Sequence, residues 1–312
     1  MSRILVTGAL GHIGSRFIHG LKENDFEEVI LLDNLSTQRY VSLFDLPKGV
    51  RFRFVEDDVC TADLTKLLKG VDVTIHLAAI TNAAGSFAIQ EEVERVNFEG
   101  TRRVAEACLE TGSQIVFLST TSVYGTQNET VDEDCSIEEL KPQSPYAASK
   151  LKAEQLLGEL HRKSGLNYVA LRFGTIFGVS VGMRFHTAIN KFVWQACLNK
   201  PITVWRTALH QRRPYLELGD AVRALHFVVN KSLFTNAIYN VLTINATVED
   251  IVEALRIHVP DLTVEFVDTQ IMNQLSYHVA CSKFQNLGFT FKGNLKEGIE
   301  ESIALLQSAY YR

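Results

Sequence analysis

Short apolar runs alternate with longer amphipathic segments through the first half of the chain. Six runs rich in β-branched residues predict strands, at residues 4–7, 28–32, 51–56, 71–77, 114–119 and 167–173. Several of these runs are apolar on both faces, which is typical of strands in a parallel sheet that helices cover on both sides. The alternation therefore predicts an α/β fold with a doubly wound parallel sheet, whose ligands bind beyond the carboxyl ends of the strands.

The regular alternation stops after Phe173. A polar and aromatic stretch at 182–186, a predicted helix at 187–199 and the segment 206–215 indicate a smaller lobe. Further along, a helical stretch and an apolar run restore the strand-helix order. We therefore expect a sheet domain and a smaller C-terminal substrate-binding lobe. The expected division is 1–173 with 215–245 returning to it, and 174–214 with 246–312.

Three glycines follow the first predicted strand. Gly8, Gly11 and Gly14 have the spacing G-x-x-G-x-x-G and lead into an apolar helix. Glycine permits the tight turn and lets the backbone approach a pyrophosphate, whose charge the helix N-terminus favours. A plain turn is the alternative interpretation. The strand-turn-helix context favours a dinucleotide site in the sheet domain.

The second predicted strand leads into Asp33, about twenty residues after the glycines, where a carboxylate can accept hydrogen bonds from an adenosine ribose. This carboxylate would repel a 2′-phosphate and no arginine immediately follows it, so the sequence favours NAD over NADP. A helix-capping or turn role for Asp33 is the alternative. The residues predicted by position to bind the cofactor are Gly8, Gly11, His12, Ile13, Gly14, Asp33, Asn34, Ser36, Asp58, Val59, Leu77, Ala78 and Ala79.

Tyr146 and Lys150 lie on one face of a predicted helix that Ser144 caps and Pro145 begins. A free phenol has a pKa of about 10 and is a poor base at neutral pH. A nearby ammonium and an oxidised nicotinamide would lower this pKa, so that Tyr146 exchanges a proton with a substrate hydroxyl. Thr120, at the end of the fifth predicted strand, is expected to bind the same oxygen. A surface helix pair is the alternative reading of Tyr146 and Lys150.

These motifs together resemble those of the extended short-chain dehydrogenase/reductases, in the NAD-dependent epimerase/dehydratase family. The resemblance covers residues 1 to about 230. The matching segments are Gly8-x-x-Gly11-x-x-Gly14, 32–36 (Leu-Asp-Asn-Leu-Ser), 76–79 (His-Leu-Ala-Ala), 119–125 (Ser-Thr-Thr-Ser-Val-Tyr-Gly) and Tyr146-x-x-x-Lys150. The resemblance implies a Rossmann domain and a homodimer.

The same resemblance assigns roles to single residues. It implies that Tyr146 is the general base, that Lys150 holds the nicotinamide ribose and tunes Tyr146, and that Thr120 binds the reacting hydroxyl. Tyr146 and Lys150 thereby also count as cofactor contacts. Asn97 resembles an asparagine that supports the active site in this family, and a helix-capping role is its alternative interpretation.

The residues after Thr120 bear on the reaction. In the dehydratase and decarboxylase branches of the resembled family an acidic residue follows, whereas this chain has Thr121 and Ser122. This favours a nucleotide-sugar 4-epimerase, in which a hydride leaves C4 for NAD and returns to the other face. A net oxidoreductase of the same fold, such as a 4-keto-sugar reductase or a hydroxy-compound dehydrogenase, is the alternative. A dinucleotide-binding regulator without turnover is a third reading, against which Tyr146 and Lys150 weigh.

A nucleotide-diphosphate sugar requires cationic and hydroxyl partners. Arginine pairs well with phosphate oxygens, because its guanidinium presents a fork of donors. Thr175 stands where sugar epimerases of the resembled family commonly have asparagine, and the segment 205–207 departs from the usual glycine-rich turn. The predicted substrate residues are Thr121, Ser122, Thr175, Arg184 and Arg213.

Composition narrows the class further. The chain is 46% hydrophobic and 21% charged, with a formal charge of −5, and has no long run of Lys and Arg, so we expect no nucleic-acid or membrane partner. The five cysteines are far apart, which predicts free thiols and no metal site. We find no secretory signal and no apolar run of membrane-spanning length, and therefore expect a cytoplasmic protein.

Overall fold

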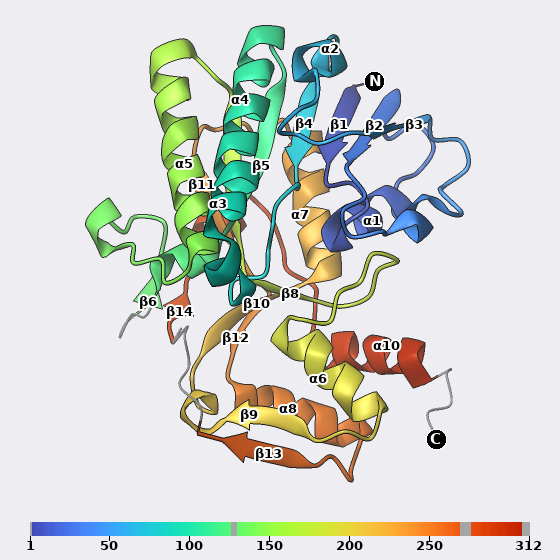
Figure 1. Cartoon of the computed structure of the whole chain (residues 1–312), viewed down its shortest axis with the longest axis vertical. Helices are drawn as coiled ribbons and strands as arrows, with labels where there is room; N and C mark the ends of the chain where they lie inside the picture. Colours follow the sequence, from blue (N-terminus) through green and yellow to red (C-terminus); the bar gives the residue numbers. More distant parts are fainter. Residues whose placement is uncertain (1, 126–129, 269–275, 308–312) are drawn as a thin grey trace.

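A computed structural model describes residues 2–125, 130–268 and 276–307. Seven strands form one parallel sheet in the order β11-β7-β5-β4-β1-β2-β3. Figure 1 shows this sheet in the upper part of the molecule. The strands are β1 (Arg3–Thr7), β2 (Glu28–Asp33), β3 (Phe52–Glu56), β4 (Val73–His76), β5 (Gln114–Thr120), β7 (Tyr168–Phe173) and β11 (Ile238–Val241). The predicted doubly wound α/β fold and its first six strands are confirmed.

Helices cover both faces of this sheet. Successive residues of a strand face opposite sides of the sheet, and in β1 the residues on both sides are apolar. Ile4 and Val6 of β1 pack with helices α1 (His12–His19) and α7 (Leu218–Asn230). Leu5 of the same strand belongs to the opposite core, which also contains residues of α2, α4 and α5. The bounds of these helices are Leu64–Leu68 (α2), Gly100–Thr111 (α4) and Pro145–Ser164 (α5).

A second group of elements lies beyond the carboxyl ends of the large sheet (Figure 1). A three-stranded sheet has the order β12-β10-β8, a pair joins β9 to β13, and another joins β6 to β14. Helices α6, α8 and α10 share a third hydrophobic core with β8, β9, β10, β12 and β13, and β6 and β14 belong to a fourth. The bounds are β6 (Thr130–Val131), β8 (Thr175–Phe177), α6 (Ala188–Cys197), β9 (Ile202–Trp205), β10 (Arg213–Glu217), β12 (Ile244–Ala246), α8 (Val248–His258), β13 (Val264–Val267), β14 (His278–Val279) and α10 (Leu295–Gln307).

The remaining helices are short. Two α-helices have only four residues each, α3 (Gln90–Val93) and α9 (Ser282–Gln285). A π-helix, η3 (Glu94–Glu99), follows α3 and runs directly into α4. The 3₁₀ turns are η1 (Tyr40–Leu43), η2 (Gly85–Ile89), η4 (Thr121–Tyr124), η5 (Ile137–Glu139) and η6 (Arg206–Ala208). Within the described ranges, no helix is long and apolar enough to cross a membrane. Residues 269–275 and 308–312 of the expected substrate lobe lie outside the described residues.

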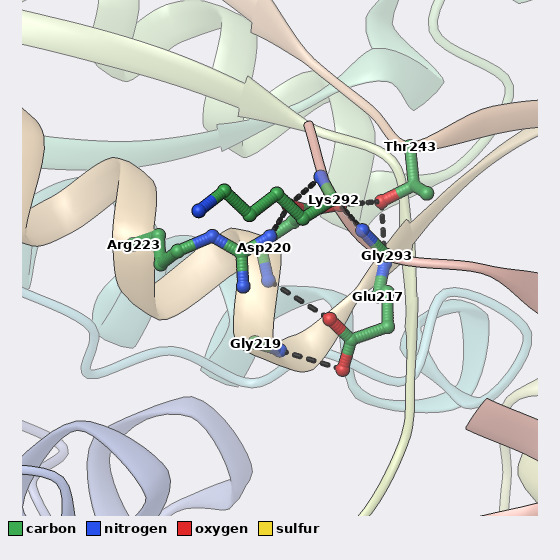
Figure 2. Close-up of polar contacts among 7 residues, drawn as sticks. All are labelled: Glu217, Gly219, Asp220, Arg223, Thr243, Lys292 and Gly293. Atoms are coloured by element: carbon green, nitrogen blue, oxygen red, sulfur yellow. Dashed lines mark hydrogen bonds and ion pairs between the residues drawn. The ribbon is translucent and has the colours of Figure 1, made fainter. Parts of the chain in front are cut away.

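A buried carboxylate joins the two groups of elements. Asp220 at the start of α7 is fully buried and forms an ion pair with Arg223. Figure 2 shows three donors around it: Oγ1 of Thr243 at 2.7 Å, the backbone N of Lys292 at 2.9 Å and that of Gly293 at 2.8 Å. A buried carboxylate is tolerated where such donors satisfy its oxygens. The segment before α10 is thereby hydrogen-bonded, through Lys292 and Gly293, to α7, which packs on the large sheet.

Candidate active site

Two adjoining cavities lie at the carboxyl ends of the parallel strands. We call the cavity beside Gly8, Gly11 and Gly14, of about 370 Å³, the turn cavity. We call the one that contains Tyr146, of about 400 Å³, the tyrosine cavity. The residues that line both are Ile13, Leu77, Ala79, Thr81, Asn82, Arg184 and His186. A molecule in one cavity therefore lies next to a molecule in the other.

The glycine turn is shaped by close contacts between backbones. Gly8 has a φ of +64°, and a Cβ placed on it would lie 2.7 Å from the backbone N of Ala78. A Cβ on Gly14 would lie 2.5 Å from the carbonyl oxygen of Ala9. Larger residues are excluded at both positions. The first turn of α1, which begins at His12, leaves backbone N–H groups without helical acceptors, and these suit an anion.

Asp33 ends β2 at the edge of the turn cavity. Its Oδ2 accepts a hydrogen bond from the backbone N of Leu10 at 3.0 Å, and its Oδ1 accepts one from that of Leu35 at 3.0 Å. These bonds fix the carboxylate beside the glycine turn. A carboxylate oxygen can accept more than one hydrogen bond, so both oxygens can also receive ribose hydroxyls. The turn role and the ribose role that the sequence left open are thus compatible.

Asp58 lines the same cavity further from the glycines. Its carboxylate accepts hydrogen bonds from Nδ2 of Asn34 at 3.0 Å and from the backbone N of Cys60 at 2.8 Å. Burial raises the pKa of Asp58, but these hydrogen bonds outweigh it and the pKa lies below its usual value. The group is therefore an ionised acceptor at neutral pH.

Tyr146 and Lys150 lie in the first turns of α5, as predicted from their spacing. Ser144 caps this helix by accepting a hydrogen bond from the backbone N of Ala147 at 3.2 Å, and Pro145 occupies its first turn. Lys150 is 2% exposed, and its Nζ donates to the carbonyl oxygen of Leu118 at 2.8 Å. Tyr146, Lys150 and Thr120 all line the tyrosine cavity.

Burial dominates the titration of both helix residues. It raises the pKa of Tyr146, while the charge of Arg184 and a hydrogen bond with Thr120 act in the opposite direction. Burial lowers the pKa of Lys150 to about 7, although the charge of Glu154 opposes it. The sequence predicted Lys150 as the cation that lowers the phenol pKa. In the structure the Lys150 ammonium donates to the Leu118 carbonyl, and the charge of Arg184 also acts to lower the pKa of Tyr146.

A network of buried polar side chains lies next to Lys150. Glu154, one turn after Lys150 on α5, accepts hydrogen bonds from Ser119 and from Arg172 on β7. Nη1 of Arg172 in turn donates to the Tyr124 hydroxyl at 2.9 Å. The network connects α5 with the strand end that carries the hydroxyl-rich run. It therefore fixes the position of the catalytic helix relative to β5.

The structure brings together most of the residues that the sequence singled out. The turn cavity is lined by Gly8, Gly11, His12, Ile13, Gly14, Asp33, Asn34, Ser36, Asp58, Val59, Leu77, Ala78 and Ala79. The tyrosine cavity is lined by Ser122, Thr175, Arg184 and Arg213 in addition to Tyr146, Lys150 and Thr120. His12 also hydrogen-bonds Ser180, with 2.7 Å between Nδ1 and Oγ.

Asn97 and Thr121 lie behind the cavity walls. Asn97 is fully buried and exchanges two hydrogen bonds with the backbone of Ile80, accepting from its N at 2.7 Å and donating to its O at 2.9 Å. Its Nδ2 also lies 3.2 Å from Oγ of Ser149, between Tyr146 and Lys150 on α5. Asn97 lies inside the π-helix η3, so it does not cap a helix. Thr121 bonds the Phe173 carbonyl at 3.3 Å.

Sequence reasoning missed several residues of the cavity walls. Arg39, Thr81 and His186 line the turn cavity, and the last two also line the tyrosine cavity. Arg39 stands in a loop beyond the second strand, where spacing gives little guidance. Among the described residues there is no cluster of His, Cys, Asp and Glu that could hold a metal ion.

The turn cavity fits a dinucleotide. The glycines leave room for a pyrophosphate, Asp33 offers a ribose acceptor, and the cavity adjoins the one that Tyr146 lines. A dinucleotide there would place its reactive ring beside a phenol, an amine and a threonine hydroxyl. The fold and site therefore define a dinucleotide-dependent enzyme that combines hydride transfer with proton transfer.

Comparison with known proteins also indicates a dinucleotide-dependent enzyme. The model of the NAD dependent epimerase/dehydratase family matches residues 4–241, and the chain belongs to this family. It is 32% identical, over 99% of both chains, to the uncharacterized UDP-glucose epimerase YtcB of Bacillus subtilis. The cofactor of this NAD-dependent enzyme family is the dinucleotide that the turn cavity fits.

Solved structures of sugar-nucleotide 4-epimerases have the same fold as this chain. A UDP-glucuronic acid 4-epimerase of Bacillus cereus, in complex with a fluorinated UDP-glucuronic acid and NAD, has a TM-score of 0.90 at 26% identity and covers 99% of this chain and 100% of its own. A UDP-N-acetylglucosamine 4-epimerase of Methanobrevibacter ruminantium has a TM-score of 0.85 at 25% identity. It covers 97% of this chain and 99% of its own.

Proposed function

We propose that this protein is an NAD-dependent epimerase that inverts C4 of a UDP-sugar. The observation that carries the proposal is the set Tyr146, Lys150 and Thr120 in a cavity that adjoins the turn cavity. The similarity to 4-epimerases in complex with UDP-sugars supports the nucleotide and the position of reaction. The hydroxyl-rich run after Thr120, where dehydratases of the resembled family carry an acid, supports epimerisation over elimination.

In this reaction NAD, when bound, supplies the hydride acceptor and donor. The Tyr146 phenolate takes the proton from the C4 hydroxyl, and the resulting hydroxyl later returns it. Thr120 holds the same oxygen, and the positive charge of Arg184 favours the phenolate form of Tyr146. Lys150 holds the nicotinamide ribose and is fixed by the Leu118 carbonyl. The sugar rotates between the two hydride transfers, so that no net oxidation occurs.

The remaining residues of the tyrosine cavity bind the rest of the substrate. Ser122 and Thr175 offer hydroxyls to the sugar, and Arg213 offers a guanidinium to the diphosphate. Trp205 lines the same cavity near Arg213 and provides a flat surface for the nucleotide base. Thr121 acts through the Phe173 backbone that it bonds.

The proposal extends to the organisation of the molecule. Residues 1–173 and 215–245 hold NAD, and 174–214 with 246–312 hold the sugar nucleotide. Two copies pair through the helices near 93–110 and the helix of Tyr146. All five cysteines are free thiols, which suits a cytoplasmic enzyme. Light scattering of the purified protein tests the dimer, and fractionation of cells tests the location.

Incubation with a panel of UDP-, GDP-, dTDP- and CDP-sugars tests the reaction, with sugars identified by NMR and absorbance followed at the NADH band. We expect a C4 epimer of a UDP-sugar without net NADH, and no product from Tyr146→Phe. The exposed Tyr40 provides a matched control, Tyr40→Phe, that should keep full activity. Net formation or consumption of NADH would instead identify an oxidoreductase of the same fold.

A further inference from the structure

Arg39 and Arg184, two of the three arginines that line the turn cavity, have no ion-pair partner among the described residues. The guanidinium of Arg39 lies beside the glycine turn, with its Nη1 4.0 Å from the position that a Cβ on Gly11 would take. Arg184 lines the same cavity, and its Nη1 donates to the Thr81 hydroxyl. In the described part of the chain, neither arginine has a carboxylate oxygen within ion-pair distance. The cavity therefore offers two guanidinium groups to an anion, although Asp33, Asp57, Asp58 and Glu92 also line it.

The donors of Arg184 are incompletely used. Its Nε is buried and has no hydrogen-bond partner among the described residues. A buried guanidinium N–H without an acceptor is unfavourable, because the charged group has lost the hydrogen bonds that water would give it. The site thus lacks an acceptor that a bound anion would supply.

The backbone around Arg184 is fixed against the glycine turn. The N of Gly182 donates to Oγ of Ser15 on α1 at 2.9 Å, and a Cβ on Gly182 would lie 2.6 Å from the Leu10 carbonyl oxygen. On the other side, Nδ2 of Asn190 donates to the Arg184 carbonyl at 3.1 Å. The arginine is therefore placed by the same turn that approaches the cofactor.

The charges of Arg39 and Arg184 also affect the pKa values of two nearby histidines. Burial together with the charges of Arg184 and Arg39 lowers the pKa of His12 to about 3 and that of His186 to about 4. Both histidines are neutral at pH 7 and add no cation. The nearest acid to Arg39, Asp33, already accepts two backbone hydrogen bonds. An anion with two charges, spanning the distance between the arginines, would satisfy this arrangement.

We propose that Arg39 and Arg184 form a clamp on the cofactor's diphosphate, which they bind from the side that the glycine turn leaves open. The backbone N–H groups of the turn contact one side of the phosphates, and each guanidinium contributes a fork of donors on the other. Arg184 is thereby a cofactor residue, and Arg213 serves the substrate's diphosphate. The clamp rests on the proposed binding of NAD at the glycine turn and is independent of the sugar.

Isothermal titration with ADP-ribose, which has the diphosphate, and NMR titration with adenosine, which lacks it, test the clamp. The variants are Arg39→Gln and Arg184→Gln, because glutamine removes the charge and keeps a donor for Thr81. The control is Arg53→Gln, since Arg53 is an exposed arginine of β3. Thermal unfolding of each variant verifies that it is folded, and Arg39→Lys and Arg184→Lys provide a second series that keeps the charge.

We expect each glutamine variant to bind ADP-ribose at least ten-fold more weakly, with adenosine and UDP affinities within two-fold of the wild type. The lysine variants should recover part of the loss, and Arg53→Gln should show none. Equal losses for ADP-ribose and adenosine would overturn the clamp, as would a loss confined to UDP. Wild-type protein that binds no ADP-ribose would contradict the proposed cofactor site itself, which separates the two failures.

Discussion

Glu154 and Arg172 form a bidentate ion pair inside the protein, with 2.9 Å between Oε1 and Nε and 2.7 Å between Oε2 and Nη2. Both side chains are 3% exposed or less. Glu154 lies one helical turn from Lys150 on α5, and Arg172 lies on β7. The pair therefore couples the charge environment of Lys150 to the sheet.

Replacement of Glu154 should change the pH dependence of turnover. The carboxylate raises the pKa of Lys150, which burial holds at about 7. Glu154→Gln removes this effect, so Lys150 should lose its proton at a lower pH. Because the reaction uses the ammonium form, we expect the alkaline limb of the kcat/KM profile to move down by about one unit. Glu159→Gln, on the exposed side of the same helix, is the control. An unchanged alkaline limb would contradict this role.

The same pair predicts a loss of stability. Arg172→Met leaves the Glu154 carboxylate buried without its cation, which should lower the free energy of unfolding by about 3–5 kcal/mol. The double variant Glu154→Gln with Arg172→Met removes both charges and should recover much of this loss. Urea unfolding of the two variants measures the difference. Equal stability of the single and double variants would show that the charge does not matter.

Buried His76 should make the protein sensitive to acid. Burial lowers its pKa to about 3, and its ring nitrogens lie 2.7 Å from the Thr7 hydroxyl and 3.0 Å from that of Thr101. An unfolded histidine titrates near 6.5, so between pH 6.5 and 3 the unfolded state binds more protons. Stability should therefore fall as the pH falls through this window, by up to ~1.4 kcal/mol per pH unit, with no effect above it.

Comparison of two variants isolates this contribution. His76→Gln should flatten the dependence of unfolding free energy on pH below 6.5 by about one proton. His278→Gln, at an exposed position, should leave the slope as it is. The slopes come from chemical unfolding at several pH values, and identical slopes for the two variants would refute the assignment.

Gly182→Ala should weaken cofactor retention without a change in the catalytic groups. The added Cβ would lie 2.6–2.8 Å from Leu10 O, Gly11 O and Ser15 Oγ, so the segment that carries Arg184 must move away from the turn. We expect less NAD to be retained during purification, measured by its absorbance after denaturation. Gly165→Ala is a comparison with open space around the Cβ, although its φ of +78° costs some stability. Full NAD retention in Gly182→Ala would contradict this account.

The sequence predicted the sheet, and it singled out Tyr146, Lys150 and Thr120, which the structure places in one cavity, because these features depend on local patterns. Strand periodicity, the glycine spacing and the Tyr146 to Lys150 helix face are set within a few residues. The position of Thr120 followed from its place at a strand end. These features needed no information about contacts between distant parts of the chain.

The contributions of Arg39 and Arg184 could not be predicted in the same way. Arg39 reaches the turn through an irregular loop, and Arg184 is placed by Gly182 and Asn190, which depend on tertiary packing. The direction of the Lys150 ammonium was likewise decided by the Leu118 carbonyl. Such contacts join segments of high sequence separation, and no spacing rule describes them.

The partners of Asp220 also bear on how the protein is made. Lys292 and Gly293 stand 72 and 73 positions further along the chain from Asp220. While the chain is still leaving the ribosome, α7 is complete before these donors have been synthesised, and burial of the carboxylate without them is unfavourable. The start of α7 therefore reaches its final packing only after Gly293 has been synthesised.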